Sequence, residues 1–538
     1  MAKRNKMCPV CFLRSLMHKV DEKNDELVPY ENIERKTPIM GWSSWNTFKN
    51  TINQDLIYDT AVAIKNTGLL DAGYEYVNLD DNWHSNMRDE NDEWQGDLVR
   101  FSSGIPSLIE KINALGLKVG LYSSNGELTC EDLPASLGRE DKDAYTLAKW
   151  GAEYFKYDFC HNVRMPEEAP LIFAIDISKK GSGTTSTIEV SNAILHGFAK
   201  RKKSKKLGGK EYVVGLDRGQ GSITFDNVNV DADGEYILTL NILKYGWFKK
   251  FVEIKVNGEK RYPINIPEQK FFNVTARFQT IVELKAGRNT IEIYNPVSSK
   301  IASARLQYEK MAYAIKNATA RVARETGKPE KKILFSICEW GGREPHTWGY
   351  SAGNMWRTTH DIMPMWWWIK GIYEHNVKLH EYASAGHFND PDMLEVGNGK
   401  LTYDENMAHF ALWCMMASPL VLGNDIRKID AKVVEIVTNK ELIAIDQDEL
   451  GKQAKRVKKG SVDILAKPLQ DGKTAVLFFN KSRGNKKVKF DLTKLVNDNF
   501  VKMNEKIGKA ENIVGDVKVD GNIATATLRP HSVVVFKI

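Results

Sequence analysis

The chain has 538 residues, of which 76 are basic and 69 acidic, so its formal net charge is +7. A net charge this small for the length gives no reason to expect nucleic acid or an anionic membrane as a partner. The sequence also contains no run of about 18 apolar residues that could span a bilayer. The length exceeds the ~250–300 residues at which single cores stop growing, so two to four domains are expected.

Residues 1–37 are charged and aperiodic, and we expect them to form an N-terminal extension. They begin MAKRNKMCPVCF and lack the apolar core of a signal peptide, which favours a cytoplasmic protein; the protein would be secreted if a leader has been removed from this sequence. Cys8 and Cys11 form a lone CxxC pair, which is a weak zinc signal because a structural zinc site needs four ligands.

From residue 38, short apolar runs alternate with helical segments. We expect strands at 38–43, 74–79, 118–122 and 153–157, with helices near 56–67, 105–115 and 144–151 between them. The alternation resumes with a helix at 304–325, a strand at 333–337, strand-like pieces ending at Asp361, near Asp390 and near Asn424, and a helix at 430–439. Such alternation indicates βαβ units and a parallel sheet, and the stretches 38–172 and 304–448 together match the ~250 residues typical of a (β/α)8 TIM barrel.

Residues 173–303 interrupt the barrel with strands joined by Gly, Asn and Asp turns, a pattern that indicates an inserted β-sandwich. Within it, Lys200–Lys206 (KRKKSKK) is a dense basic run, either a solvated loop or a site for an anionic partner such as an acidic polysaccharide. Residues 449–538 return to short strands and predict a C-terminal antiparallel β-domain. The fold class is therefore α/β, a barrel with one inserted and one terminal β-domain.

Barrel enzymes place their chemistry at the carboxyl ends of the strands. Those ends hold Trp45, Asp80 with Asp81, Tyr122, Lys156 with Asp158, Glu339 with Trp340, Arg357 with Asp361, and Asp390 with Asp392. Carboxylates accept hydroxyl hydrogen bonds and indole faces cover the C–H face of a ring, so the set suits a sugar. The same acids could hold a hard cation and His84, His360 and His387 could bind a transition metal, but no HxH or HExxH spacing occurs.

The sequence of the two expected barrel segments resembles glycoside hydrolase family 27, the family of α-galactosidases and α-N-acetylgalactosaminidases. The matching stretches, in the family's order, are MGWSSWN, VNLDDNW, GLYSS, YFKYDFC, SICEWGG, WRTTHDI, FNDPDML, SPLVLGNDIR and IAIDQDELGKQ. The resemblance implies a retaining mechanism in which Asp158 is the nucleophile and Asp361 the general acid/base, with carboxyl groups about 5–5.5 Å apart. We expect Lys156 to keep Asp158 ionised, and Asp361 to have a raised pKa.

By the same resemblance, Asp80 and Asp81 bind the galactose O4 and O6 hydroxyls and Trp45 packs on the sugar. Lys156 and Arg357 hold ring hydroxyls, while Tyr122, Asp392, Glu339 and Trp340 complete the pocket. Glu339 is typical of α-galactosidases, whereas Gly341-Gly342 lacks the bulk that excludes a 2-acetamido group. The expected activity is hydrolysis of terminal α-D-galactosyl residues in galactose-containing oligosaccharides or glycosides. The alternatives are an α-N-acetylgalactosaminidase, a β-L-arabinopyranosidase and a non-catalytic sugar-binding barrel.

Further expectations concern residues around this pocket. Cys130 and Cys160 are similar in position to a family disulfide, although they would be reduced in the cytoplasm; Asn82 replaces a family cysteine. Trp366–Trp368 are expected to pack a barrel helix, with a place at the site rim as the alternative. The insert is similar to carbohydrate-binding modules of the family 35 and 6 type, in which Glu189 would bind a structural Ca²⁺. No cofactor is expected for catalysis, and the oligomeric state is left open.

Overall fold

We describe a computed structural model of the chain, which covers residues 27–30, 35–182, 184–244, 248–258, 260–268, 274–496 and 509–538. It divides into two compact units, one containing Val163–Leu306 and the other Leu27–Asn162 with Gln307–Ile538. The CxxC pair at Cys8 and Cys11 lies outside the described residues. The described helices include none that is both long and apolar enough to cross a membrane.

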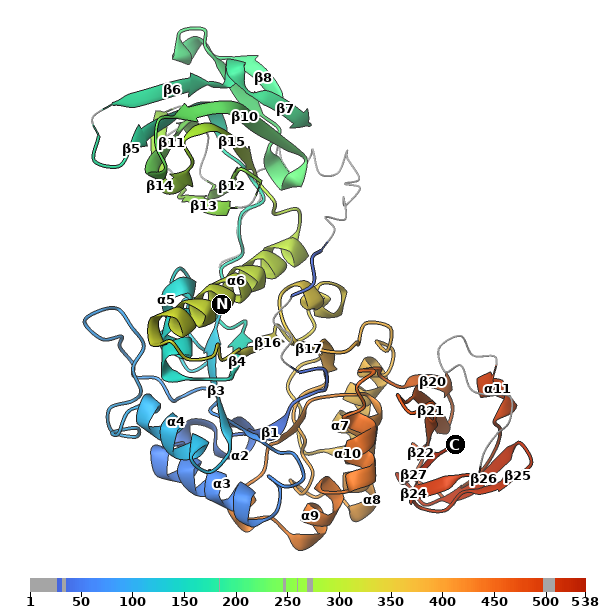
Figure 1. The fold of residues 1–538 in the computed structure, drawn as a ribbon. Helices are drawn as coiled ribbons and strands as arrows, with labels where there is room; N and C mark the ends of the chain where they lie inside the picture. The colour runs from blue at the N-terminus through green and yellow to red at the C-terminus, as the bar shows by residue number, and fades with distance from the viewer. Residues whose placement is uncertain are drawn as a thin grey trace. The chain divides into compact units, whose positions relative to one another are not determined.

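The larger unit contains a parallel sheet of eight described strands (Figure 1). In sheet order they are β18 (Phe388–Asp390), β17 (Met355–Arg357), β16 (Leu334–Cys338), β4 (Tyr154–Asp158), β3 (Lys118–Ser124), β2 (Tyr76–Asn78), β1 (Met40–Ser43) and β19 (Leu420–Leu422). The two ends of this order meet at Leu394, just beyond β18, which forms a parallel bridge with Leu422 and donates its N–H to the carbonyl of Val421 at 2.7 Å. The sheet is thus closed, and the predicted barrel is confirmed.

Helices cover the outer face of this barrel, so most strand residues are buried on both sides, as in other all-parallel sheets. They are α3 (Gln54–Asn66), α4 (Ile105–Asn113), α5 (Glu140–Trp150), α6 (Lys300–Thr326), α7 (Trp366–Asn376), α8 (Tyr403–Met415), α9 (Ala431–Val437) and α10 (Lys440–Asp446). Helix α4 shows why they pack: Ile105, Leu108, Ile109 and Ile112 repeat at helical spacing and are all buried. Helix α8 begins at a capping box, in which Thr402 and Glu405 satisfy each other's backbone N–H.

The smaller unit is a sandwich of two antiparallel sheets, as predicted for the insert. One sheet has the order β13 (Lys260–Ile266), β12 (Lys250–Val256), β15 (Gly287–Tyr294), β10 (Gly221–Val230) and β7 (Ile194–Gly197). The other has the order β14 (Val274–Leu284), β11 (Gly234–Lys244), β5 (Leu171–Lys179), β9 (Glu211–Val214) and β8 (Lys200–Lys203), with β6 (Thr185–Glu189) paired to β5. A single apolar cluster fills the space between them. Strand β5 begins two residues before the predicted boundary at 173, and α6 begins four residues before the predicted restart at 304.

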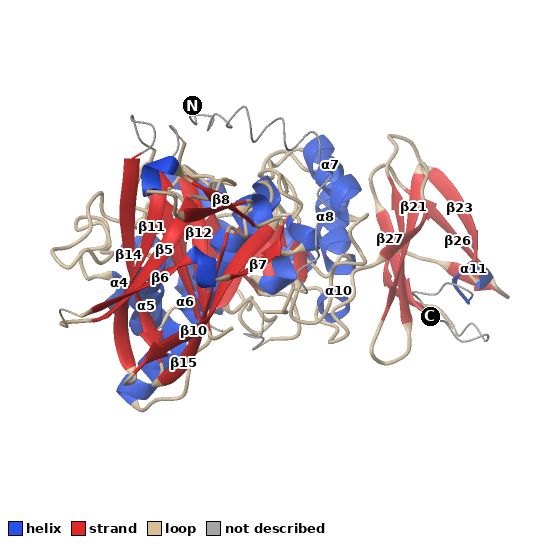
Figure 2. Cartoon of the chain, turned by 90° about the horizontal axis from the view of Figure 1, so that it is seen from above, coloured by secondary structure: helices blue, strands red, loops and turns tan. Residues whose placement is uncertain are grey.

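The C-terminal domain is a second antiparallel sandwich, seen from above in Figure 2. One sheet has the order β20 (Lys455–Lys458), β21 (Val462–Pro468), β22 (Thr474–Asn480), β27 (Val533–Lys537) and β24 (Glu511–Val514); the other has β23 (Lys486–Asp491), β26 (Ile523–Leu528) and β25 (Lys518–Asp520). Its core includes Phe478, Phe490 and Phe536.

The C-terminal domain is joined to barrel helix α7 through buried polar groups. The hydroxyl of Tyr373 on α7 donates to the carboxylate of Asp463 at 2.9 Å, and Arg456 bridges Asp463 to Glu374 of α7. Because buried charges are costly unless paired, these contacts give α7 one well-defined position. Helix α7 begins five residues after Asp361, so the C-terminal domain also helps to place the end of the barrel where the candidate acid/base lies.

Candidate active site

The polar residues expected from the strand ends do gather at the carboxyl end of the barrel. On β4 the alternate residues Tyr154, Lys156 and Asp158 share one face, because side chains alternate along a strand. A cavity at this end of the barrel is lined by Ser43, Asn78, Leu79, Asp80, Leu121, Tyr154, Lys156, Ser336, Arg357, Asp390, Asp392, Met393, Pro419 and Val421. Asp80, Arg357 and Asp390 are among the lining residues that lie at or just beyond strand carboxyl ends, which all reach the same rim.

Asp158 ends β4 and its side chain is buried, with 5% of the residue exposed. Its Oδ2 accepts a hydrogen bond from the hydroxyl of Tyr122 at 3.0 Å, and its Oδ1 accepts one from the backbone N–H of Phe159 at 2.8 Å. Burial raises the pKa of Asp158 to about 6, against the opposing effect of the Lys156 ammonium, and the charge of Asp361 raises it further. Both oxygens are therefore oriented, and the group titrates near neutral pH.

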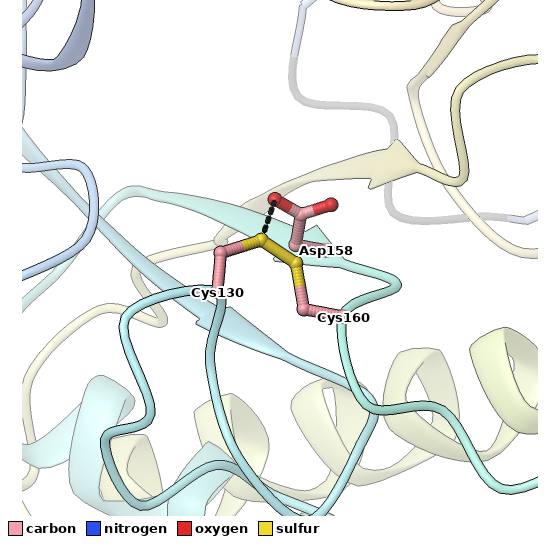
Figure 3. Close-up of side chains that lie close together, drawn as sticks. All are labelled: Cys130, Asp158 and Cys160. Atoms are coloured by element: carbon pink, nitrogen blue, oxygen red, sulfur yellow. Dashed lines mark hydrogen bonds between the residues drawn. A yellow bond between two sulfur atoms is a disulfide. The ribbon is translucent and has the colours of Figure 1, made fainter. Parts of the chain in front are cut away.

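A disulfide between Cys130 and Cys160 lies directly beside this carboxylate (Figure 3). The Sγ of Cys130 is 3.8 Å from Oδ2 of Asp158. The loop carrying Cys130 is held by Asp81, whose Oδ2 accepts the backbone N–H of Glu131 at 3.0 Å. The pairing implied by the family resemblance is thus the one present in the structure, and it closes one wall around Asp158.

Asp361 lies four residues beyond the end of β17, and 63% of its side chain is exposed. Its Oδ1 is 2.9 Å from Nη2 of Arg357, and the same nitrogen is 2.8 Å from Oδ2 of Asp392. Burial would raise the pKa of Asp361, but the charges of Arg357, Lys156 and His360 outweigh it and lower that pKa. The expectation of a raised pKa at Asp361 was wrong, because the Arg357 guanidinium is paired with this carboxylate.

Asp80 and Lys156 form the other ion pair of the cavity. The Nζ of Lys156 is 2.8 Å from Oδ2 of Asp80 and lies 5.2 Å from the ring centre of Tyr122. The hydroxyl of Ser43 donates to Oδ2 of Asp80 at 3.3 Å. A half-buried ammonium and a buried carboxylate held in this way present both donors and acceptors to a polyhydroxylated ligand.

Asp81 is turned partly away from this pair. Its Oδ1 accepts the backbone N–H of Asn82 at 2.7 Å, in addition to the contact from Oδ2 to Glu131. Burial raises the pKa of Asp81 to about 6. Asp81 therefore stabilises the loop that carries Cys130, in addition to any contact it makes with a ligand.

The Glu339–Gly342 segment follows β16 and differs from what the sequence indicated. Glu339 is fully buried, and burial raises its pKa to about 7 against the opposing effect of Arg343. The nearest cation is Nη1 of Arg343 at 3.6 Å. A Cβ on Gly341, which has φ +75°, would lie 2.0 Å from the carbonyl oxygen of Thr358, so only glycine fits there.

Gly342 is the glycine of this pair that leaves space. A Cβ there would meet nothing closer than Oε2 of Glu339, at 3.8 Å. Glycine is therefore required at position 341 by the nearby backbone of Thr358. Only at position 342 could a larger side chain be accommodated and limit the size of a ligand group. Two tryptophans of the expected site are partly exposed. Trp340 has a positive φ of +59°, and Trp45 is the first residue of the short helix α2 (Trp45–Phe48).

Glu189, at which a structural Ca²⁺ is expected, is paired with a lysine in the structure. Oε1 of Glu189 accepts from Nζ of Lys210 at 2.6 Å. Among described residues, the group of His, Cys, Asp or Glu side chains close enough to share an ion is Cys130, Asp158 and Cys160, which is the disulfide region. The structural Ca²⁺ expected in the insert stays a prediction.

Asp390 lines the cavity, although the sequence assigned it no contact with a sugar. It ends β18 opposite Arg357 in register, lines the cavity, and its Oδ1 accepts the backbone N–H of Asp392 at 2.8 Å. Burial raises its pKa to about 6. Its position at a strand end was visible in the sequence; Tyr154 and Ser336, which also line the cavity, had no such signal because they lie inside strands.

A closed barrel with an acid-lined cavity and two interacting carboxylates at its carboxyl end is the arrangement of a glycoside hydrolase. The model of the family described as alpha galactosidase A matches residues 37–182 and 299–448, and that of the alpha galactosidase C-terminal beta sandwich domain matches 459–538. The chain therefore belongs to the α-galactosidase family, glycoside hydrolase family 27.

Individual relatives agree with this assignment. Alpha-galactosidase 2 of Arabidopsis thaliana is 31% identical over 451 residues, covering 83% of this chain and 76% of the relative. Alpha-galactosidase A of Cellvibrio japonicus is 32% identical over 468 residues, covering 85% and 79%. The crystal structure of alpha-galactosidase I from Mortierella vinacea shares the fold, with a TM-score of 0.64 at 24% identity, covering 94% of this chain and 98% of that one. The protein is a glycoside hydrolase.

Proposed function

We propose that this enzyme removes terminal α-D-galactosyl residues from galactose-containing oligosaccharides or glycosides with retention of configuration. The observation that supports the proposal best is the buried Asp158 carboxylate, oriented on both oxygens and close enough to Asp361 that the charge on Asp361 raises its pKa. Two carboxyl groups flanking one site are the minimum that a double displacement requires.

In the first step, an oxygen of Asp158 attacks the anomeric carbon while the bond from that carbon to the leaving oxygen breaks. Asp361 gives its proton to that oxygen, and a covalent galactosyl ester of Asp158 remains. In the second step, the Asp361 carboxylate takes a proton from water, the water oxygen attacks the same carbon, and Asp158 leaves as a carboxylate. The hydroxyl of Tyr122 donates to Oδ2 of Asp158 and stabilises the negative charge that returns there. Only the two carboxyl groups and water react, so the proposal includes no cofactor.

The ion pairs of the cavity supply the contacts to the sugar in this proposal. Asp80 and Lys156 present an acceptor and a donor side by side, and Arg357 with Asp392 does the same across the cavity. A ring hydroxyl that binds Arg357 competes with Asp361 for the same guanidinium. Substrate binding would then weaken the Arg357–Asp361 pair and raise the pKa of Asp361, which is what an acid catalyst needs.

Activity is expected to fall above about pH 6. Burial sets the pKa of Asp158 to about 6 and Asp361 titrates below its usual range, so above pH 6 the two carboxyl groups together hold no proton. The first step needs one proton on the pair, because Asp361 must donate it. We therefore expect kcat/KM for an unactivated galactoside to decrease about tenfold per pH unit above that value. A profile that stays flat to pH 8 would contradict this arrangement of charges.

The choice of sugar is tested by comparing three aryl glycosides: α-galactoside, α-N-acetylgalactosaminide and β-L-arabinopyranoside. We expect the α-galactoside to be preferred, because the Asp80–Lys156 pair would lose a hydroxyl partner if the C6 group were absent. Gly342→Leu fills the space beside Glu339 and serves as the matched variant: it should further suppress any turnover of the acetamido substrate. Preference for the acetamido substrate would overturn the proposal, and no turnover of any substrate would favour a non-catalytic sugar-binding barrel.

A further inference from the structure

The three consecutive tryptophans that begin α7 have three different environments. Trp366 packs on the C-terminal domain, with its ring 5.8 Å from that of Phe479 and 5.1 Å from that of His531. Trp368 donates its indole N–H to the backbone carbonyl of Asp361 at 2.9 Å. Trp367 is 61% exposed, and its ring centre is 5.1 Å from that of Trp368. Packing thus accounts for Trp366 but not for the other two.

Trp367 belongs to a run of exposed apolar side chains that starts at Asp361. Met363 is 45% exposed and Met365 37%, whereas Ile362 between Asp361 and Met363 is buried. Asp361, Met363 and Met365 are thus all exposed in this segment. We refer to Met363, Met365, Trp367 and the partly exposed Trp368 as the Trp367 platform. Contiguous exposed apolar groups of this kind mark binding surfaces more often than scattered single residues do.

The position of Asp361 says which part of a substrate would meet this platform. In the proposed reaction Asp361 gives its proton to the leaving oxygen, so the leaving group must lie against the Asp361 side chain. Trp368 is bonded to the backbone of Asp361, and Trp367 is in contact with Trp368. These two contacts connect Trp367 to the residue that faces the departing group in the proposed reaction.

We propose that the Trp367 platform is the binding site for the leaving group, and that it selects leaving groups that are rings with an apolar face. This inference rests on the proposed function. Indole rings stack on flat apolar faces, and both a pyranose ring, through its C–H face, and an aryl ring provide one. Trp367 supplies the stacking surface, while Trp368 is a positioning residue that fixes the backbone of Asp361 beneath it. An acyclic leaving group gains nothing from the platform.

The test compares leaving groups on one sugar: methyl α-D-galactopyranoside, which has no ring to leave, melibiose, which releases glucose, and phenyl α-D-galactopyranoside. We expect Trp367→Ala to lower kcat/KM roughly 3- to 10-fold for the two ring leaving groups, and by less than about twofold for the methyl glycoside. Trp367→Phe, which keeps an aromatic face, should recover most of the loss. Tyr313→Ala removes an aromatic side chain of matching exposure, 62%, elsewhere on the unit and should change none of the three rates.

The outcomes separate the platform from the proposed function. If the unaltered enzyme hydrolyses none of the galactosides, the proposed function fails and the platform proposal with it. If it hydrolyses them but Trp367→Ala lowers all three rates equally, the side chain acts on the placement of Asp361 and the platform proposal is overturned. A loss for melibiose alone assigns the platform to saccharides, and a loss for the phenyl glycoside alone to aryl groups. A change in oligomeric state of Trp367→Ala without a change in these rates would assign the surface to contact between copies of the chain and overturn the proposal.

Discussion

Asp158→Ala is expected to lower kcat for α-galactosides by about 10⁴-fold or more, because the proposed reaction has no other nucleophile to form the glycosyl ester. The cavity left by the missing carboxylate lies beside Tyr122 and can admit a small anion. Adding azide with an activated aryl galactoside should therefore restore turnover and give β-galactosyl azide, the inverted product. Rescue without inversion, or retention of more than about 1% of the rate, would assign the nucleophile to another group.

Asp158→Asn provides the control for folding and a further test of the charge at this position. Burial raises the pKa of Asp158 from 3.8 to about 6, so the folded protein holds this proton more tightly than the unfolded chain does. The ionised carboxylate therefore destabilises the fold above pH 6, by about 3 kcal/mol for a shift of two units, and has no such effect below pH 4. We expect the Asn variant to be inactive yet to have a higher Tm than the parent at pH 7, with the difference disappearing near pH 4.

Asp361→Ala is expected to have an effect that depends on the leaving group. For methyl α-galactoside, kcat/KM should fall about 10²–10⁴-fold, because methoxide needs a proton to depart. For an activated aryl galactoside the fall in kcat/KM should be less than about tenfold, since the leaving phenolate needs little assistance. With the activated substrate kcat should still drop, because no group remains to activate water in the second step. The glycosyl ester should then accumulate and be detectable as a mass increase on the protein.

The structure provides a matched control for this variant. His360 is the exposed neighbour of Asp361, and its charge is one of the influences that lower the pKa of Asp361. His360→Ala should shift the pH dependence slightly toward higher pH without any dependence on the leaving group. Arg357 keeps its pairing with Asp392 in Asp361→Ala, so the fold of the site should survive. Equal losses on both substrates in Asp361→Ala would remove Asp361 from the acid/base role.

The barrel was predictable because its signals are local. Apolar runs such as those of β3 and β4 are buried on both faces and alternate with amphipathic helices, and this period needs no knowledge of distant contacts. The same regularity allowed the strand ends to be identified from the sequence. Asp158, Lys156 and Arg357 could therefore be predicted as site residues. The two β-domains were likewise evident from their turns, although their edges differed by a few residues because strand ends are decided by pairing partners.

The pKa values of the two carboxyl groups, Asp158 and Asp361, were not predictable from the sequence. They depend on which charged side chains from different strands come into contact. Lys156 was expected beside Asp158 on one strand face, but in the structure its ammonium pairs with Asp80, just beyond β2. Arg357 instead reaches Asp361, which reverses the expected order of the two pKa values. The meaning of Gly341 was hidden for the same reason: the oxygen that excludes a Cβ belongs to Thr358, on the neighbouring strand's loop.

The amino-acid order by itself determined the alternation of strands and helices, the rim to which the acids belong, and the family motifs around them, since each is written in residues close together in the chain. Only the tertiary structure decided which carboxylate is paired with which cation, that Glu339 is fully buried, and that Trp367 remains exposed while Trp366 packs on a domain more than a hundred residues away in the chain. The physical reason is that burial and charge pairing depend on distances through space, and these are set only when the barrel closes and the C-terminal domain docks against α7.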